Sequence, residues 1–238
     1  MTRGFFDGEY QDGELRGCCF LAGRRGMGKT TEMCRLLMQC TGGALLFDPL
    51  SRHETVLRAA VIITQPGELA RYLRTNAGRR FRVLYQPRAG DVQAHFRAVC
   101  TIVRAVGWMV FGIDELDMMC GAEWGAKRMP PEFSHLVHYG RHCRVSMLAT
   151  ARRPMDVARG FTSQCESMRL FSMQEETDLK YFERYIGEQD ARRLPSLPKW
   201  RYLYWTGSGP AQVRQGGAIV SHVPPSQAQR RGAMRYSA

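Results

Sequence analysis

The sequence predicts an α/β fold in which a mostly parallel central β-sheet is flanked by helices, and three observations support this prediction. Short apolar runs alternate with amphipathic helical patterns along most of the 238 residues, as in parallel sheets with helical connections. A glycine-rich segment separates the first apolar run, 18–22, from a helical pattern. A continuous apolar run at 108–113 ends in two acidic residues, and such runs are typical of strands buried on both faces.

Apolar runs of strand length recur along the chain. We expect strands at 18–22, 44–47, 61–64, 81–85, 108–113, 145–149, 168–171 and 201–205, with the last one at an edge of the sheet. Apolar residues at helical spacing predict helices over 30–40 and 134–142, and another with Pro66 in its first turn. Asp91 is suited to cap a long helix that ends near Val106. Ser172 and Glu175 have the spacing of a capping box before a further helix.

The chain is long enough for one large domain with a buried core. We expect an N-terminal extension at 1–16, the α/β domain at 17–222, and a basic flexible tail at 223–238, where apolar residues become sparse. The segment 121–131, with glycines, basic residues and two prolines, predicts an exposed loop.

The formal net charge of +12 favours a polyanionic partner such as nucleic acid. A base-composition bias of the gene is the alternative, since only four of the 34 basic residues are lysines. The eight cysteines form no C-x-x-C pair, so we interpret them as small core residues in a reducing compartment. The sequence has no apolar run of membrane-spanning length and no signal-peptide pattern, which favours a cytoplasmic location without membrane insertion.

The segment 23–30 matches the phosphate-binding pattern G-x-x-x-x-G-K-[ST] at every position. Glycines allow backbone N–H groups to surround a phosphate, and the following helix adds its positive dipole end. Lys29 is expected to reach the β- and γ-phosphates, and the Thr30 hydroxyl to bind Mg²⁺. A chance glycine-rich turn is the alternative, but the flanking strand and helix favour a nucleotide site. The expected cofactor-binding residues are Gly23, Arg24, Arg25, Gly26, Met27, Gly28, Lys29, Thr30 and Thr31.

Two acids follow the apolar run 108–113. Asp114 is suited to hold Mg²⁺, and Glu115 to polarise an attacking water as a general base. Asp117 is a weaker candidate and is better explained as a residue at the start of a helix. Asn76 is the only asparagine and Ala77 follows it, so the Asn-Lys-x-Asp pattern of GTPases is absent. The sequence therefore predicts ATP hydrolysis.

The segment 139–154 adds a third motif, in which a helix ending in Gly-Arg precedes a strand that ends in Thr and Arg-Arg-Pro. With the other two motifs, it resembles the FtsK–HerA superfamily, and more narrowly the genome-packaging ATPases of tailless, membrane-containing DNA viruses of the tectivirus type. The resemblance implies a P-loop NTPase fold of the RecA-like (ASCE) kind. It also implies a ring, usually hexameric, around double-stranded DNA, with an arginine of the neighbouring subunit completing each site. Arg141 is the first choice for that arginine and Arg144 the second.

The sequence departs from the family pattern at Arg152, where many members have glutamine. Glutamine can both donate to and accept from water, whereas arginine only donates. The water-orienting role is therefore open, and Arg152 is expected instead to contact the γ-phosphate, with Thr150 supplying an acceptor.

The leading hypothesis is an ATP-driven motor that translocates viral double-stranded DNA into a preformed capsid. Its partners would be DNA, further copies of the chain, and capsid vertex or portal-type proteins, in host cytoplasm and virion. Lys127 and Arg128 are candidates for pore-facing contacts with DNA phosphates. Two alternatives stay open: an assembly ATPase of the filamentous-phage type, and a nucleotide-binding, DNA-associated vertex protein without motor activity.

Overall fold

The computed structural model of the chain describes residues 17–51, 60–88, 90–120, 129–207 and 210–219. The expected extension at 1–16, the expected tail at 223–238 and the candidate pore residues Lys127 and Arg128 lie outside these ranges. Within them, no helix has the length and apolar character needed to span a membrane.

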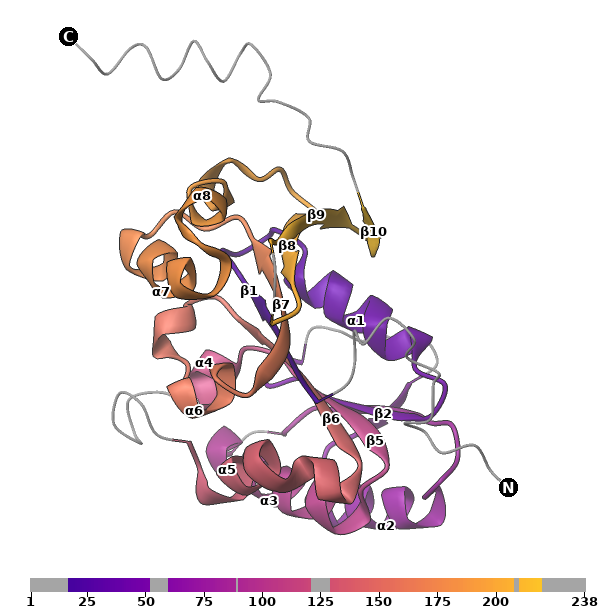
Figure 1. Cartoon of the computed structure of the whole chain (residues 1–238). Coiled ribbons are helices and arrows are strands. Elements are labelled where there is room, and N and C mark those ends of the chain that lie inside the picture. Colours follow the sequence, from indigo (N-terminus) through magenta and orange to yellow (C-terminus); the bar gives the residue numbers. More distant parts are fainter. Residues whose placement is uncertain (1–16, 52–59, 89, 121–128, 208–209, 220–238) are drawn as a thin grey trace, which may run out of the picture.

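A ten-stranded sheet forms the centre of the described structure, in the order β10-β9-β8-β7-β1-β6-β5-β2-β4-β3 (Figure 1). The part β7-β1-β6-β5-β2-β4-β3 of this order consists of parallel pairs. Strands β8, β9 and β10 extend the sheet beyond β7 through antiparallel pairs. The strands are β1 (Cys18–Ala22), β2 (Gly43–Phe47), β3 (Val61–Ile63), β4 (Arg82–Tyr85), β5 (Met109–Ile113), β6 (Val145–Ala151), β7 (Cys165–Phe171), β8 (Arg201–Trp205), β9 (Gln212–Gln215) and β10 (Ala218–Ile219). The prediction of a mostly parallel sheet flanked by helices is confirmed.

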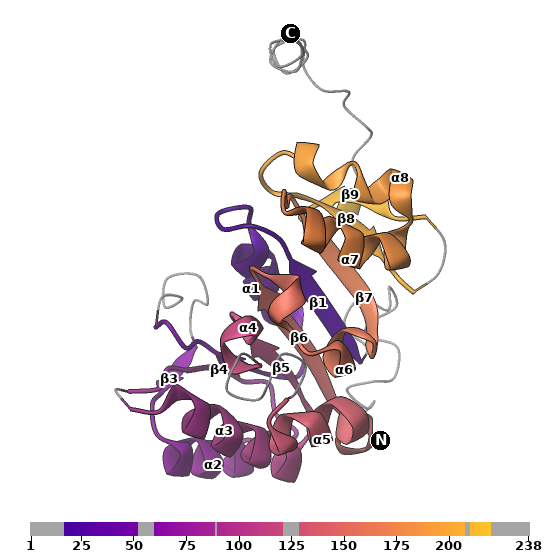
Figure 2. The ribbon, with the colours of Figure 1, turned by 90° about the vertical axis from the view of Figure 1, so that its left-hand side faces the viewer.

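Helices connect the parallel strands and cover the sheet (Figures 1 and 2). They are α1 (Lys29–Gln39), α2 (Pro66–Thr75), α3 (Val92–Val106), α4 (Leu116–Met119), α5 (Pro131–Tyr139), α6 (Arg159–Thr162), α7 (Glu176–Ile186) and α8 (Glu188–Ala191). Short 3₁₀ turns are η2 (Gly140–Cys143), η3 (Pro154–Asp156) and η4 (Leu194–Ser196). The Asp91 side chain caps α3 by accepting from the Gln93 N–H at 2.9 Å, as predicted.

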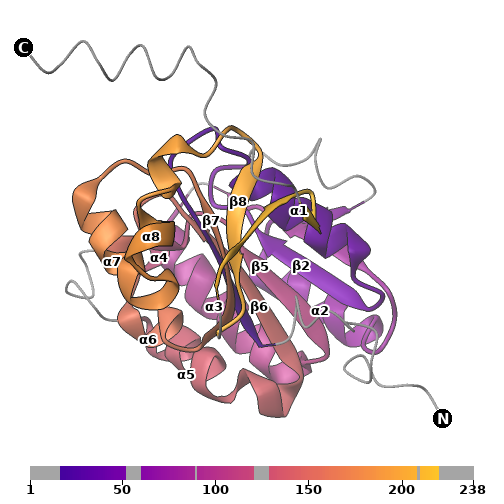
Figure 3. The same ribbon diagram turned by 45° about the horizontal axis from the view of Figure 1, so that its top comes forward.

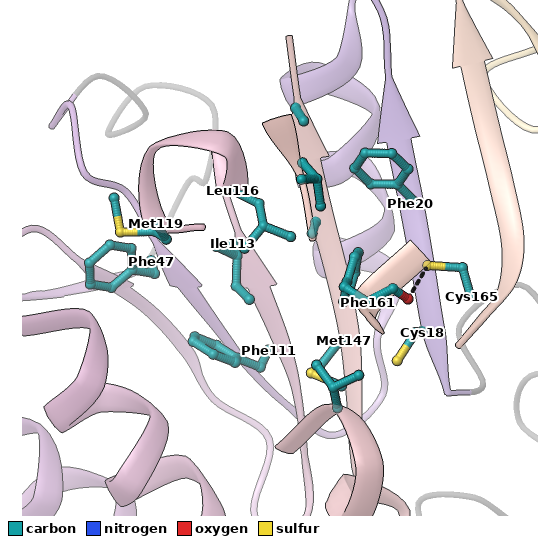
Figure 4. Close-up of a cluster of buried hydrophobic side chains, with 14 of the residues drawn as sticks. Cys18, Phe20, Phe47, Phe111, Ile113, Leu116, Met119, Met147, Phe161 and Cys165 are labelled. Atoms are coloured by element: carbon teal, nitrogen blue, oxygen red, sulfur yellow. Dashed lines mark hydrogen bonds between the residues drawn. The ribbon is translucent and has the colours of Figure 1, made fainter. Parts of the chain in front are cut away.

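The two faces of the sheet bury separate hydrophobic cores. Alternate residues of the strands point to opposite faces, so Phe20 packs with the larger cluster and its neighbour Leu21 with the smaller one. Helices α2, α3, α5, α6 and α7 contribute to the larger cluster, whereas α1 supplies the helical side of the smaller one. In the larger core, Phe20 meets Phe161 edge to face at 5.8 Å between ring centroids (Figure 4).

Seven of the eight cysteines are buried and all are free, which fits their interpretation as core residues. Cys143 is the exception, because it is only half-buried. Figure 4 shows Cys18 and Cys165 within the larger core, where the Cys165 thiol donates to the carbonyl of Phe161. Burial raises the pKa of Cys18 to about 12, so this thiol stays protonated at neutral pH.

Three local predictions were wrong. The strand β8 is not at an edge of the sheet, because β9 pairs with it on the side away from β7. Ser172 does not cap α7: the N-cap is Glu175, and the Ser172 hydroxyl donates to the carbonyl of Pro195 at 3.3 Å. Trp108 lies outside β5 with a φ of 55° and 41% exposure, since the chain enters the strand through a turn at Gly107.

A buried ionic cluster fixes α1 to the strands β7 and β8. The carboxylate of Glu32 on α1 accepts from Arg35 at 2.6 Å and from the hydroxyl of Tyr202 at 2.8 Å. Arg169 of β7 is fully buried and donates to the same carboxylate at 3.3 Å. Burial alone would raise the pKa of Glu32, but hydrogen bonds from Arg35 and Tyr202 and the charge of Arg169 outweigh it and lower the pKa. The helix that follows the phosphate loop is thus held by charge as well as by apolar contacts.

We expect Glu32→Ala to lower the free energy of unfolding by about 3 kcal/mol, because removing one partner of a buried ion pair leaves the other charge uncompensated. Urea unfolding followed by circular dichroism measures the change. Glu176→Ala, which removes an exposed ion pair with Lys180 on α7, is the control and should have little effect. Equal stability of the two variants would show that the buried cluster contributes nothing.

Candidate nucleotide-binding site

The phosphate loop connects the carboxyl end of β1 to α1 and is anchored to the ends of two neighbouring strands. The Gly23 N–H donates to the carbonyl of Ala151 at 3.3 Å, and the Arg24 N–H to that of Ser172 at 2.9 Å. Gly23 has a φ of 145°, and a Cβ on it would lie 2.8 Å from the Cβ of Phe171. Only glycine fits this close approach.

Lys29 is the first residue of α1 and is almost fully buried. Its Nζ donates to the carbonyl of Arg24 at 3.1 Å, so the side chain folds back across the loop. Burial lowers the pKa of Lys29, while the charges of Glu115, Asp114 and Asp117 oppose the shift. A lysine in this position can bind phosphate oxygens that enter the loop.

Strand β6 lies between β1 and β5, so the ends of all three strands meet at one edge of the sheet. There the Asp114 Oδ1 accepts hydrogen bonds from the hydroxyl of Thr150 at 2.5 Å and from that of Thr30 at 3.2 Å. Mg²⁺ is usually bound by one or two protein oxygens together with substrate phosphates and water. The hydroxyl of Thr30 and the carboxylate of Asp114 are suited to such a site, and no cluster of three His, Cys, Asp or Glu side chains suited to another metal occurs in the described part of the chain.

Glu115 follows Asp114 in a left-handed backbone conformation, with a φ of 54°. Its N–H donates to the Thr150 hydroxyl at 3.0 Å, and its carboxylate forms an ion pair with Arg152 at 2.5 Å. Burial raises the pKa of Glu115, and the charges of Asp114 and Asp117 add to this, while Arg152 opposes it. Glu115 is therefore a carboxylate with increased proton affinity at the edge of the pocket, as a general base requires.

These residues surround a pocket of about 260 Å³. Its lining contains Arg25, Gly26, Gly28, Lys29, Thr30, Thr31, Glu115, Arg152, Lys199 and Trp200. The structure thus brings the loop, the general-base candidate and Arg152 together. Of the other predicted loop residues, Gly23 and Met27 support the backbone, and Arg24 contributes its carbonyl. Asp114 is not part of the lining, but its carboxylate accepts from the hydroxyl of Thr30, which is.

The predicted arginine-finger residues lie just before β6 begins, at the opposite ends of the strands from the pocket. Arg141 is 83% exposed and forms an ion pair with Glu166 at 2.6 Å. Arg144 lies over the ring of Trp108, with 3.9 Å between its guanidinium carbon and the ring centroid. Neither residue lines the pocket of its own chain.

Three residues near the site were missed by sequence reasoning. Asp48 is fully buried at the end of β2, beside Asp114, and accepts from the amide of Gln86 at 3.1 Å. An acid after an apolar run was visible in the sequence, but the pairing of β2 with β5 was not. Lys199 and Trp200 reach the pocket from the start of β8, and no local pattern predicts that approach.

No protein-family model and no curated protein sequence matches the chain. Its fold is similar to that of the genome-packaging NTPase B204 from Sulfolobus turreted icosahedral virus 2, solved with AMPPCP, with a TM-score of 0.66 and 16% identity over 84% of this chain and 97% of that chain. The DNA-packaging ATPase B204 from Sulfolobus turreted icosahedral virus gives a TM-score of 0.64 and 15% identity over 85% and 98%. VirB4 of Thermoanaerobacter pseudethanolicus gives 0.60 and 13% identity over 94% of each chain. The predicted P-loop NTPase fold is confirmed.

We expect Thr150→Val to lower the free energy of unfolding by about 1–3 kcal/mol, because the N–H of Glu115 and the carboxylate of Asp114 lose a buried hydrogen-bond partner. Thr150→Ser keeps the hydroxyl and should stay close to wild type. Chemical denaturation of the three proteins measures the difference. If valine were tolerated as well as serine, the hydroxyl would have no role in joining β6 to β5 at the site.

Proposed function

We propose that the chain is an ATP-hydrolysing motor that translocates double-stranded DNA, in the packaging of a viral genome into a preformed capsid. The observation that carries the proposal is the meeting of Lys29, the Thr30–Asp114 pair and Glu115 around one pocket at the carboxyl edge of the sheet. The solved structures with similar folds include two viral packaging enzymes, and the chain covers 97% and 98% of their length.

The residues of the site suit hydrolysis of a bound nucleoside triphosphate. The loop and Lys29 bind the β- and γ-phosphates. Thr30 and Asp114 would hold a Mg²⁺ ion, which would offset charge on the phosphates. Glu115 orients and deprotonates the attacking water. Arg152 favours the ionised form of Glu115 through their ion pair and lines the pocket, where it can contact the γ-phosphate. Catalysis then rests mainly on positioning and electrostatic stabilisation.

A head-to-tail ring brings the opposite edge of one subunit to the pocket of the next, since repeated heterologous contacts that close generate rings. Arg141 is our first candidate for the arginine that acts in trans, because it lies on the surface away from its own pocket. Arg144 is the second candidate. A hexamer is the ring size that the resemblance implies.

The net charge of +12 supports a DNA partner that is bound through its phosphates. Lys127 and Arg128 remain candidates for such contacts, and capsid vertex or portal-type proteins are the expected docking partners, in host cytoplasm and virion. The two alternative functions, a filamentous-phage-type assembly ATPase and a vertex protein without motor activity, are outcomes of the experiment below.

We expect double-stranded DNA to stimulate ATP hydrolysis at about 50 mM salt and to lose most of this effect at about 200 mM, because phosphate contacts weaken steeply with salt. Phosphate release, measured with and without DNA at both concentrations, tests this. Lys29→Ala is the control and should be inactive under every condition.

Hydrolysis that DNA does not stimulate would contradict the translocase and favour an assembly ATPase. Nucleotide binding without hydrolysis would favour the vertex protein. A Lys29→Ala variant with wild-type activity would show that the phosphate loop is not the active site.

A further inference from the structure

Trp200 is a large aromatic side chain at the pocket that hydrolysis, as described above, does not use. Its backbone N–H donates to the carbonyl of Met27 in the phosphate loop at 3.0 Å. Its ring packs against Gly28, where an added Cβ would lie only 2.5 Å from Cε3 of the indole. The side chain is nevertheless 43% exposed and lines the pocket. One part of the ring therefore supports the loop, and another part is available to a ligand.

The backbone of Trp200 is held in an unfavourable conformation, with a φ of 71°. A bulky residue in this region is strained and persists only where its surroundings fix it. The backbone of Trp200 is fixed by the strand that follows it. β8 begins at the next residue, and Tyr202 in β8 donates to the buried Glu32 of α1. Figure 3 shows β8 and α1 at the same end of the sheet. Such strained residues cluster at ligand-binding sites.

Lys199 adds a positive charge beside this ring. Its Nζ lies 4.9 Å from the centroid of the Trp200 ring, and the residue lines the same pocket. An ammonium at this distance from an indole face makes a cation–π contact. The pocket thus has phosphate-binding groups in its loop and a π surface with an adjacent cation at β8.

We propose that Trp200 is the nucleobase platform of the pocket, on which the base of the bound nucleotide stacks beside the Lys199 ammonium. This inference rests on the proposed function, because the phosphates must occupy the loop. A planar heteroaromatic base is the part of a nucleotide that an indole surface recognises, and base–aromatic stacking needs no specific hydrogen bonds. The loop then fixes the phosphates, while the platform fixes the other end of the ligand.

Isothermal titration of the full chain with ATP and with inorganic tripolyphosphate, both with Mg²⁺, separates the base from the phosphates. We expect Trp200→Ala to weaken ATP binding about 10-fold and to change tripolyphosphate binding by less than about twofold. Trp200→Phe keeps an aromatic face and should retain ATP affinity within about threefold. Trp108→Ala is the matched control, because Trp108 is equally exposed and also carries a basic residue over its ring, at the opposite edge. It should bind both ligands as wild type does.

An unchanged ATP affinity of Trp200→Ala would overturn the proposal. An equal loss for ATP and tripolyphosphate would also overturn it, since the ring would then only support the loop. Tighter tripolyphosphate binding by Trp200→Ala would overturn it in favour of a ring that obstructs the loop. If the wild-type chain bound neither ligand, the phosphate loop and with it the proposed function would fail, which is distinct from a failure of the platform alone.

Discussion

The two hydrogen bonds of Thr150 fix the geometry on which the candidate site depends. Its hydroxyl donates to the carboxylate of Asp114 and accepts from the N–H of Glu115. Both bonds require β6 to lie in parallel between β1 and β5, so that the ends of the three strands meet at one edge. One hydroxyl therefore positions the acid that faces Thr30 and the backbone of the acid that pairs with Arg152. A shift of β6 would separate the phosphate loop from both acids.

At the candidate site, acidic and basic side chains offset one another, and burial shifts the pKa of Lys29 and of Glu115. Three acids lie close to Lys29, and burial together with the neighbouring carboxylates increases the proton affinity of Glu115. The ion pair with Arg152 limits that increase. The exposed arginines Arg141 and Arg144 lie at the opposite ends of the strands from the pocket, as the proposed head-to-tail ring requires. The buried Glu32 cluster links the phosphate loop through α1 to β8, and so to the ring of Trp200.

Sequence reasoning predicted the parts of the fold and site whose information is local. The phosphate loop contains all its residues in one stretch, and the cap at Asp91 depends only on the next few residues. Predictions failed where distant segments decide the outcome: Ser172 bonds to Pro195 instead of capping α7, and β8 acquires a partner from a later hairpin. Trp200 reaches the pocket because β8 pairs beside β7, and that pairing leaves no local trace in the sequence.

In the proposed function, the site at the carboxyl ends of the parallel strands hydrolyses ATP, with Glu115 activating the water. The most direct measurement compares ATP affinity and single-turnover hydrolysis in wild type and Glu115→Gln. Glutamine keeps the size of the side chain but cannot accept the proton. We expect ATP to bind with nearly the wild-type affinity, while the rate constant of hydrolysis falls about 100-fold or more, as for loss of a general base. An unchanged rate constant would contradict the general-base role of Glu115, because the water would then be activated elsewhere.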